Sequence, residues 1–261
     1  MRGALAPYVA SVVAYDVDLG GPGVHRGLPS TTVTFVLPVG EPLDVGWQDR
    51  PGSREQRWST LSGLHAHPAE IHHDGHQAGV QLALTTTGAR ALLGLPAAEL
   101  AGLLLELDDV APALRHLPER LHATPRAGWV DLVEQALVEA LAQHDAPEPR
   151  AEVGHALARL TRGASVAAVA DEVGYSRRHL GSLVRAECGI APKQVQRIGR
   201  FQASRALVGR VPLADVAHRC GYADQSHLTR EWVALAGCPP STWLREEFPF
   251  LQDLGTTVEG G

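Results

Sequence analysis

Residues 171–189 read DEVGYSRRHLGSLVRAECG, and residues 215–237 read DVAHRCGYADQSHLTREWVALAG. The two stretches follow one pattern. Gly174 and Gly221 begin the same Gly-Tyr turn 47 residues apart, and one added residue in the second turn makes the later displacement 48. Such self-similarity at a fixed offset indicates an internal duplication. The other matched pairs are Val169 with Val216, Ala170 with Ala217, Tyr175 with Tyr222, Leu180 with Leu228, Val184 with Trp232, Gly189 with Gly237 and Pro192 with Pro240.

Each copy has the pattern of a helix-turn-helix unit. A first helix with alanine and valine on its apolar face must end at the glycine, which adopts a left-handed conformation without steric cost. Ser176 and Asp224 are placed to cap the helix that follows. Leu180 and Val184, with their counterparts in the second copy, anchor that helix at positions i and i+4. Its opposite face stays polar and can reach base edges in DNA.

The duplication favours DNA binding over ordinary helix packing. One pair of short helices joined by a glycine is common in helical proteins and would not separate the two interpretations. The segment between the copies, residues 192–209 (PKQVQRIGRFQASRALVG), begins with proline and predicts a connecting helix. A helix of about 16 residues spans about 24 Å. We expect it to hold the two second helices about 34 Å apart, which is one duplex turn.

Charge is distributed unevenly along the chain. The formal net charge of −6 is composed of −8 in residues 1–150 and +2 in residues 151–261. The total charge by itself argues against a nucleic-acid partner, but the mildly basic C-terminal half agrees with one. Cys188, Cys220 and Cys238 are odd in number and far apart, so we expect small buried hydrophobes and neither a disulfide nor a zinc site.

The C-terminal half resembles the DNA-binding domain of the AraC/XylS family. The resemblance rests on the duplicated unit, the helix between the copies, the phrase GYADQSHLTREW and the closing GCPPSTWLRE, and it covers residues 153–247. It implies an all-α domain with two helix-turn-helix motifs. The first motif departs from the family pattern, because Val184 stands where an aromatic residue is usual and Gly181 and Ser182 replace longer polar side chains.

The resemblance also implies roles for individual side chains. Arg178 and Arg230 suit guanine, and Gln225 suits adenine. Base- or phosphate-facing places fall to Arg177, Arg178 and Ser182 in the first motif, and to Gln225, Ser226, His227 and Arg230 in the second. Backbone contacts, which position the protein without reading sequence, fall to His179, Arg185, Thr229, Arg197 and Arg200. With the two capping positions, the expected DNA-binding set is Ser176, Arg177, Arg178, His179, Ser182, Arg185, Arg197, Arg200, Asp224, Gln225, Ser226, His227, Thr229 and Arg230.

The N-terminal half has the pattern of a β-rich domain. We expect short strands separated by Gly/Pro/Asp turns at residues 8–18, 31–37, 43–47 and 78–84, with Pro38 ending the second of them. The period then changes to that of helices, expected at 88–93, 97–105 and 125–144.

Segments 25–37 and 79–100 resemble a cupin-like domain of poorly characterised ligand that precedes AraC-type domains in bacterial regulators. This resemblance implies that the domain senses a signal or forms a dimer. The helix near residues 129–141 could mediate dimerisation or pack on the β-domain, and the sequence favours neither.

Histidines crowd into HAHPAEIHHDGH, residues 65–76. His65, His67 and Glu70 resemble a cupin metal motif with one residue missing from its usual gap, and on a strand His65 and His67 would share one face. Two imidazoles and a carboxylate can bind a divalent metal. No second metal motif follows, so we favour a histidine-rich polar turn, and we expect no metal and no cofactor.

We therefore expect an α+β protein of two domains. A β-rich cupin-like sensory or dimerisation domain with a C-terminal helix occupies residues 1–145, and a linker at 146–152 joins it to the DNA-binding domain at 153–247. A flexible tail covers residues 248–261.

The function expected of this chain is sequence-specific regulation of transcription, as a regulator of the AraC type, without catalysis. It is an activator or a repressor, and the sequence favours neither. Double-stranded DNA is the partner, with RNA polymerase, a small-molecule effector and a second copy of the chain as further candidates. Because no apolar run reaches a membrane span and no signal peptide is evident, we expect a cytoplasmic, nucleoid-associated protein. The alternatives are a metal-dependent cupin enzyme with an accessory DNA-binding domain and a ligand-free architectural protein.

Overall fold

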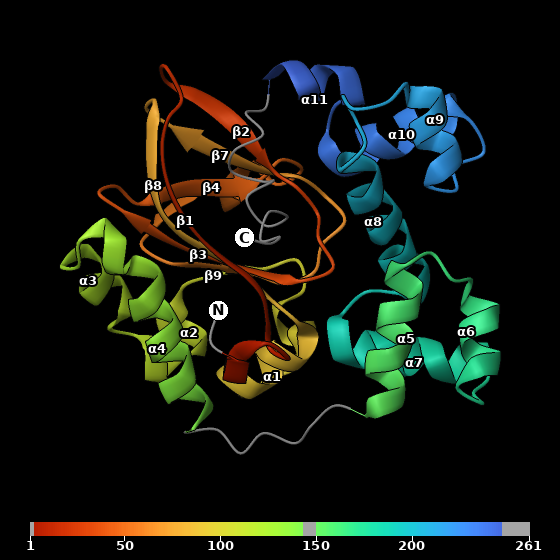
Figure 1. Cartoon of the computed structure of the whole chain (residues 1–261), viewed down its shortest axis with the longest axis horizontal. Helices are drawn as coiled ribbons and strands as arrows, with labels where there is room; N and C mark the ends of the chain where they lie inside the picture. Colours follow the sequence, from red (N-terminus) through yellow and green to blue (C-terminus); the bar gives the residue numbers. More distant parts are fainter. Residues whose placement is uncertain (1–2, 143–149, 247–261) are drawn as a thin grey trace.

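The structure is a computed structural model that describes residues 3–142 and 150–246. Two antiparallel sheets form the N-terminal part, and a chain of short helices forms the C-terminal part (Figure 1). One sheet has the order β1-β8-β3-β6-β9 and the other β2-β7-β4-β5. The strands are β1 (Val9–Asp18), β2 (Gly23–Gly27), β3 (Val33–Val39), β4 (Leu43–Trp47), β5 (Glu55–Arg57), β6 (Thr60–Ser62), β7 (Ala69–His73), β8 (His76–Leu84) and β9 (Leu104–Leu105).

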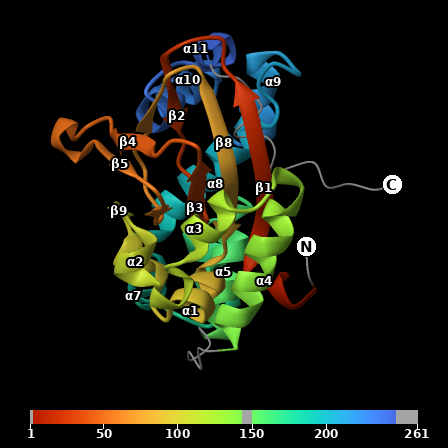
Figure 2. The same ribbon diagram turned by 90° about the vertical axis from the view of Figure 1, so that its left-hand side faces the viewer.

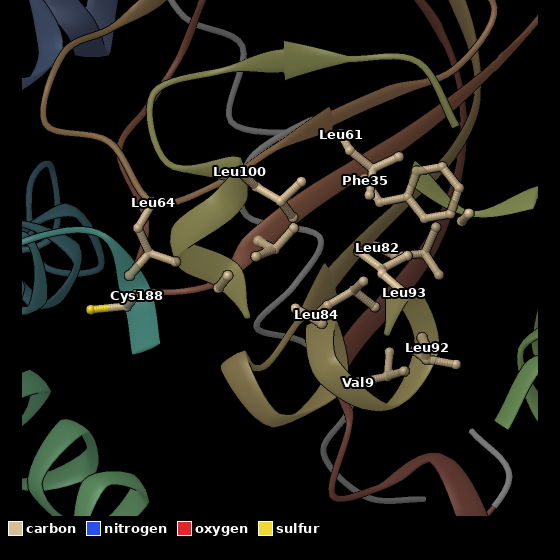
Figure 3. Close-up of a cluster of buried hydrophobic side chains, with 14 of the residues drawn as sticks. Val9, Phe35, Leu61, Leu64, Leu82, Leu84, Leu92, Leu93, Leu100 and Cys188 are labelled. Carbon is tan, nitrogen blue, oxygen red and sulfur yellow. The ribbon is translucent and has the colours of Figure 1, made fainter. Parts of the chain in front are cut away.

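The first sheet is built on two central strands whose alternate side chains are buried. Phe35 on β3 and Leu82 on β8 are paired in register, and both are 0% exposed. Figure 3 shows them in one apolar cluster with residues of β6 and of the helix that follows β8. This period-two burial is the pattern expected of half-buried antiparallel strands.

Helices cover one end of the sheets (Figures 1 and 2). The helix after β8 begins where the side-chain oxygen of Thr85 accepts a hydrogen bond from the backbone N–H of Gly88, an N-cap that stops the strand and starts the helix. The α-helices here are α1 (Thr86–Leu93), α2 (Leu107–Val110), α3 (Leu117–His122) and α4 (Trp129–Leu141); the 3-10 turns are η1 (Gly3–Leu5), η2 (Pro51–Ser53), η3 (Ala97–Leu100), η4 (Pro112–Leu114) and η5 (Arg126–Gly128).

Several expectations for this half need correction. Pro38 does not end β3, which continues to Val39. On one side of β3, Pro38 pairs with Gly79 of β8. On the other side, the pairing with β6 reaches only as far as Val36. Proline is tolerated there because no neighbour needs its missing N–H. The expected helix at 97–105 is only the turn η3 followed by β9. The helix expected at 125–144 begins with η5, and α4 proper is shorter.

Packing on the β-domain accounts for the apolar face of α4. Val133 and Leu137 are 0% exposed, and Trp129 at its start is 5% exposed. The helix lies along the lower part of β1 and beside α3 (Figure 2). One of the two alternatives for this helix is therefore seen directly, whereas dimerisation through it stays a hypothesis.

Residues 150–246, the described C-terminal part, form seven α-helices arranged around one of them. They are α5 (Ala151–Thr161), α6 (Val166–Glu172), α7 (Arg177–Cys188), α8 (Pro192–Arg205), α9 (Leu213–Arg219), α10 (Gln225–Ala236) and α11 (Pro240–Glu246). Helix α8 runs between the α5–α7 group and the α9–α11 group, and both groups pack on it (Figure 1). The predicted connecting helix is confirmed, ending at Arg205 and not at residue 209.

The hydrophobic core continues across the boundary between the N-terminal and C-terminal halves. One hydrophobic cluster runs from the sheets through η3 into α7 and α8, and Cys188 lies beside Leu64 and Leu100 in it (Figure 3). The α9–α11 group has a separate cluster that includes Leu28 of the N-terminal half. Of the expected linker, residues 146–149 lie outside the described residues, as does the expected tail at 248–261; Ala151 already begins α5. No helix in the described ranges is both long and apolar enough to cross a bilayer.

Close packing of α8 on α5 makes Gly199 irreplaceable. A Cβ atom at this position would clash with the backbone of Thr161, including its carbonyl oxygen. We expect Gly199→Ala to lower the free energy of unfolding by about 1–3 kcal/mol, because backbone cannot give way as a side chain can. The control is Gly154→Ala on α5, where no atom lies within 4 Å of the added methyl group. Urea unfolding of this control should show a gain of up to about 1 kcal/mol; equal effects at the two positions would contradict the packing.

Candidate DNA-binding surface

The first helix-turn-helix unit is α6 and α7, and its local geometry follows the sequence. Gly174 has φ +72° and turns the chain after α6. The Ser176 hydroxyl oxygen then accepts a hydrogen bond from the His179 backbone N–H at 3.1 Å, which caps α7. Leu180 and Val184 are 0% exposed and fix α7 against the core. The predicted turn, cap and anchors of this unit are confirmed.

The second unit, α9 and α10, repeats this geometry. Gly221 also has φ +72°, and the Asp224 carboxylate accepts a hydrogen bond from the His227 backbone N–H at 2.6 Å. Leu228 and Trp232 are 0% exposed. Because the caps and glycines match so closely, the first turns of α7 and α10 present their side chains in equivalent ways.

A tyrosine-histidine ring pair spans the turn of each unit and also repeats. Tyr175 and His179 meet edge-to-face at 4.8 Å between ring centroids, and Tyr222 and His227 do so at 5.4 Å. His227 Nδ1 accepts a hydrogen bond from the Ala223 backbone N–H, so a neutral ring carries its proton on Nε2. The second unit therefore holds this imidazole in one tautomer, with Nε2 as a donor.

Most of the predicted DNA-binding side chains lie on the exposed faces of α7 and α10. The exposed residues are Ser176, Arg177, Arg178, His179, Ser182 and Arg185 in the first unit and Asp224, Gln225, Ser226 and Arg230 in the second; His227 and Thr229 are half-buried. Two hydroxyls turn back to their own helix, since Ser182 donates to the Arg178 carbonyl and Thr229 to the Gln225 carbonyl. Ser176 and Asp224 serve as caps.

Arg197 and Arg200 on α8 differ from the others because the structure gives them intramolecular partners. Arg197 donates two hydrogen bonds to the Glu231 carboxylate, at 2.8 and 3.1 Å. Arg200 donates to the Gly221 carbonyl at 3.2 Å, and its guanidinium lies over the Tyr222 ring at 5.2 Å. These two arginines join the connecting helix to the second unit, a role that the sequence alone did not indicate.

The arginines of α7 and α10, the recognition helices of the two units, differ from the two arginines on α8. Within the described ranges, Arg177, Arg178, Arg185 and Arg230 form no ion pair. Their guanidinium groups are exposed on α7 and α10 and stay available to an external anion or base edge. The contrast with α8 separates the scaffold arginines from the candidate readers.

The N-terminal half contacts the opposite ends of the recognition helices. Arg90 on α1 forms a bidentate ion pair with Glu187 near the end of α7, and Glu187 is only 5% exposed. Gly189, which ends α7, fits directly against Ala101, where a Cβ atom would clash. Gly237, its counterpart after α10, fits in the same way against Gln48. Sequence reasoning missed these contacts; only the repeated glycines, 48 residues apart, marked the two positions.

A cavity of about 360 Å³ opens between the two sheets and reaches α8. Its walls are mainly apolar, and Gln202, Arg205 and Ala206 of α8 close one side. Gln202 also accepts hydrogen bonds from the backbone N–H and hydroxyl of Thr31, at 3.2 and 2.9 Å. The helix that connects the two helix-turn-helix units is therefore part of the cavity wall.

The structure does not support the strand expected for the metal motif. His65 and His67 lie in an irregular segment before β7, where His65 Nδ1 is 2.6 Å from the His67 carbonyl oxygen, and only Glu70 is on the strand. Among the described residues, no group of three or more His, Cys, Asp or Glu side chains is arranged to hold a metal ion. The histidine-rich segment is also less of a turn than expected, because His72 and His73 lie on β7 and His76 begins β8.

A family model described as a helix-turn-helix domain matches residues 169–246. Residues 169–246 therefore form a helix-turn-helix domain, in agreement with the AraC-type resemblance of the sequence. The expectation of a DNA-binding transcription regulator is thereby confirmed. A search of curated proteins finds no significant match.

Solved structures that match most of this chain share its fold, and a further match covers the C-terminal part alone. ToxT from Vibrio cholerae O395 is 11% identical, with a TM-score of 0.52, over 92% of this chain and 98% of ToxT. Unsaturated fatty acid-bound ToxT from strain SCE256 is 12% identical, with a TM-score of 0.52, over 91% and 95% of the chains. The DNA-binding domain of AdpA in complex with a target DNA is 27% identical over 37% of this chain and 90% of that domain, with a TM-score of 0.32. The ToxT similarity confirms the expected α+β two-part fold.

Two half-buried imidazoles in the cavity wall give the free energy of unfolding a predictable dependence on pH. Burial lowers the pKa of His25 to about 4, with the nearby His73 as a second cause. Burial likewise lowers the pKa of His65 to about 4, against the opposing effect of its hydrogen bond to the His67 backbone. A histidine in the unfolded chain has a pKa of about 6.5. As pH falls, His25 and His65 are therefore protonated at a higher pH in the unfolded chain than in the folded protein.

We therefore expect the stability supplied by neutral His25 and His65 to be complete above about pH 6.5 and to decline as pH falls toward 4. Each imidazole contributes at most about 1.4 kcal/mol per pH unit. Urea unfolding between pH 7 and 5 measures the slope, and His25→Gln should make it shallower. A slope that His25→Gln leaves unchanged would contradict the burial of a neutral imidazole at this position.

Proposed function

We propose that this regulator reads two successive major grooves on one side of DNA, with the N-terminal halves of α7 and α10. The observation that carries this proposal is the contrast among arginines: those on the two recognition helices are exposed and without intramolecular ion pairs among the described residues, whereas Arg197 and Arg200 are engaged within the fold. Such an arrangement leaves the guanidinium groups of the two recognition helices available to DNA, while those of Arg197 and Arg200 are used within the fold. We propose no catalytic activity.

Base reading is proposed for a few side chains and backbone contacts for the rest. Arg178 and Arg230 would donate to guanine, and Gln225 would pair with adenine. His179 and the Nε2–H of His227 are donors suited to phosphate oxygens. Arg197 and Arg200, first expected at the DNA backbone, are here assigned to holding the second unit on α8.

The cavity between the sheets is proposed to take a small, mainly apolar effector. A ToxT structure of the same fold is described as bound to an unsaturated fatty acid. In the present chain Arg205 of α8 lines the cavity and could meet an acidic group, so occupancy would bear directly on the connecting helix. The effector would then shift the population of arrangements that the two units adopt.

The remaining assignments follow from this function. We propose a sensory domain at residues 1–145, a DNA-binding domain at 153–247, and a cytoplasmic, nucleoid-associated regulator with RNA polymerase and a second copy of the chain as candidate partners. No observation on the described residues favours the metal-dependent enzyme or the architectural protein.

Selection of bound sequences from random duplex DNA by the full-length protein tests the proposed function. We expect one enriched site with two half-sites about 10 base pairs apart, matching one duplex turn. Enrichment of no sequence above the input library would overturn the proposal.

Arg230→Ala is expected to weaken binding to the selected site and to relax the preference at one base by about 1–3 kcal/mol. Competition binding with single-base site variants measures both effects. Arg120→Ala, which removes an exposed charge of the same sign on α3, is the control and should change neither. A base preference that survives Arg230→Ala would contradict the assigned role.

The affinity of the full-length protein for its site should fall steeply with salt, because each neutralised phosphate releases a counterion. Titrations between about 50 and 200 mM salt provide the slope of log K against log[salt]. A slope near zero would be incompatible with phosphate contacts from these helices.

A further inference from the structure

The exposed face of α7 has a gap at one edge. Arg178, Ser182 and Arg185 lie at positions i, i+4 and i+7, so their side chains share this face, and Gly181 lies beside Arg185 where the exposed face meets the buried one. Gly181 is nevertheless buried, although it has no side chain of its own. Another group must therefore cover it.

The side chain of Arg185 covers this glycine. A Cβ atom placed on Gly181 would lie 3.5 Å from Nη1 of Arg185, which is its one neighbour within 4 Å beyond the local helix backbone in the described structure. Helical side chains point toward the N-terminus of their helix, so the arginine extends back along α7. Its guanidinium thus lies about one turn closer to the DNA-facing end than its own Cα.

The second unit places its arginine differently. At the displacement of 48, Thr229 corresponds to Gly181, Arg230 to Ser182, and Val233 to Arg185. Val233 is 45% exposed and cannot donate a hydrogen bond. Arg185 is therefore attached to α7 about one turn farther from the start of its helix than Arg230 is on α10. The small residues Gly181 and Ser182 leave a channel along which the Arg185 side chain extends back toward the start of α7.

The guanidinium of Arg185 is also free to act. The nearest acidic residue along α7, Glu187, is held by Arg90 through three hydrogen bonds of 2.9–3.0 Å on the side facing the N-terminal half. Arg185 has no ion pair within the described ranges. All its donors remain for an external partner.

We propose that Arg185, lying over Gly181, reads a guanine for the first recognition helix and does not merely contact the DNA backbone. In the second unit the guanidinium comes from Arg230, which is equivalent to Ser182. In the first unit Arg185 supplies it instead. A guanidinium in the groove can donate two hydrogen bonds to O6 and N7 of guanine. This inference rests on the proposed function, since it requires α7 to enter a major groove.

The test uses the full-length protein, the site it selects from random DNA, and single-base variants of that site. Arg185→Ala is expected to lose, by about 10-fold, the preference for guanine at one position of the α7 half-site, with the other preferences unchanged. Gly181→Gln fills the channel with a long side chain and should lose the same preference. Gly181→Ala is the matched control, because its methyl group makes only an ordinary contact with Arg185 and leaves the channel open.

The outcomes separate this inference from the function on which it rests. If Arg185→Ala weakens binding to every site variant by one common factor, the residue contacts phosphate and the inference is overturned. Retention of the guanine preference by Gly181→Gln overturns it as well. If the wild-type protein selects no sequence at all, the proposed function fails, and this inference fails with it.

Discussion

The packing of α8 determines where both recognition helices lie. Gly199 brings α8 against the backbone of α5, which fixes the first unit. On the other side Arg197 binds Glu231, and the indole N–H of Trp232 donates to the buried Ser204 hydroxyl at 2.9 Å. Edge-to-face contact between Phe201 and Trp232, at 4.9 Å, adds an apolar element to the same interface. Because both units attach to one short helix, their separation is a property of the fold.

Helix α8 also connects the two helix-turn-helix units to the N-terminal half. Gln202 and Arg205 of α8 face the cavity between the sheets, one turn or less from the residues that hold the second unit. The N-terminal half meets the C-terminal ends of α7 and α10, while the capped N-terminal ends stay exposed. In the Arg90–Glu187 pair the carboxylate is buried and the guanidinium is partly exposed, so loss of Arg90 would leave a buried charge without its partner. The N-terminal half thus contacts both recognition helices at their C-terminal ends and leaves their N-terminal ends uncovered.

Local signals account for what the sequence predicted well. The glycines at 174 and 221, the caps at 176 and 224 and the buried anchors of each unit depend on residues within one turn of each other, so their spacing is visible in the chain. Strands β2, β5, β6, β7 and β9 escaped prediction; each has five residues or fewer and is defined by its pairing with another strand and not by a pattern of its own. A short segment carries no period of its own.

Contacts between distant segments could not be predicted. Arg90 and Glu187 are 97 residues apart, and nothing in either local sequence marks the pair. The sequence predicted a phosphate contact for Arg197, because the ion pair of Arg197 with Glu231 depends on how α8 crosses α10. The His65 motif failed for a related reason, since the chain before β7 is irregular and does not place His65 and His67 on one strand face.

Helical phasing of the DNA site tests the central claim most directly. Full-length protein should bind the selected site, and inserting about five base pairs, half a duplex turn, between the half-sites should reduce binding to that of a single half-site, because α8 cannot follow the second groove to the other side. Unchanged affinity after that insertion would show that the two units move independently, and it would contradict a spacing set by the packing of α8.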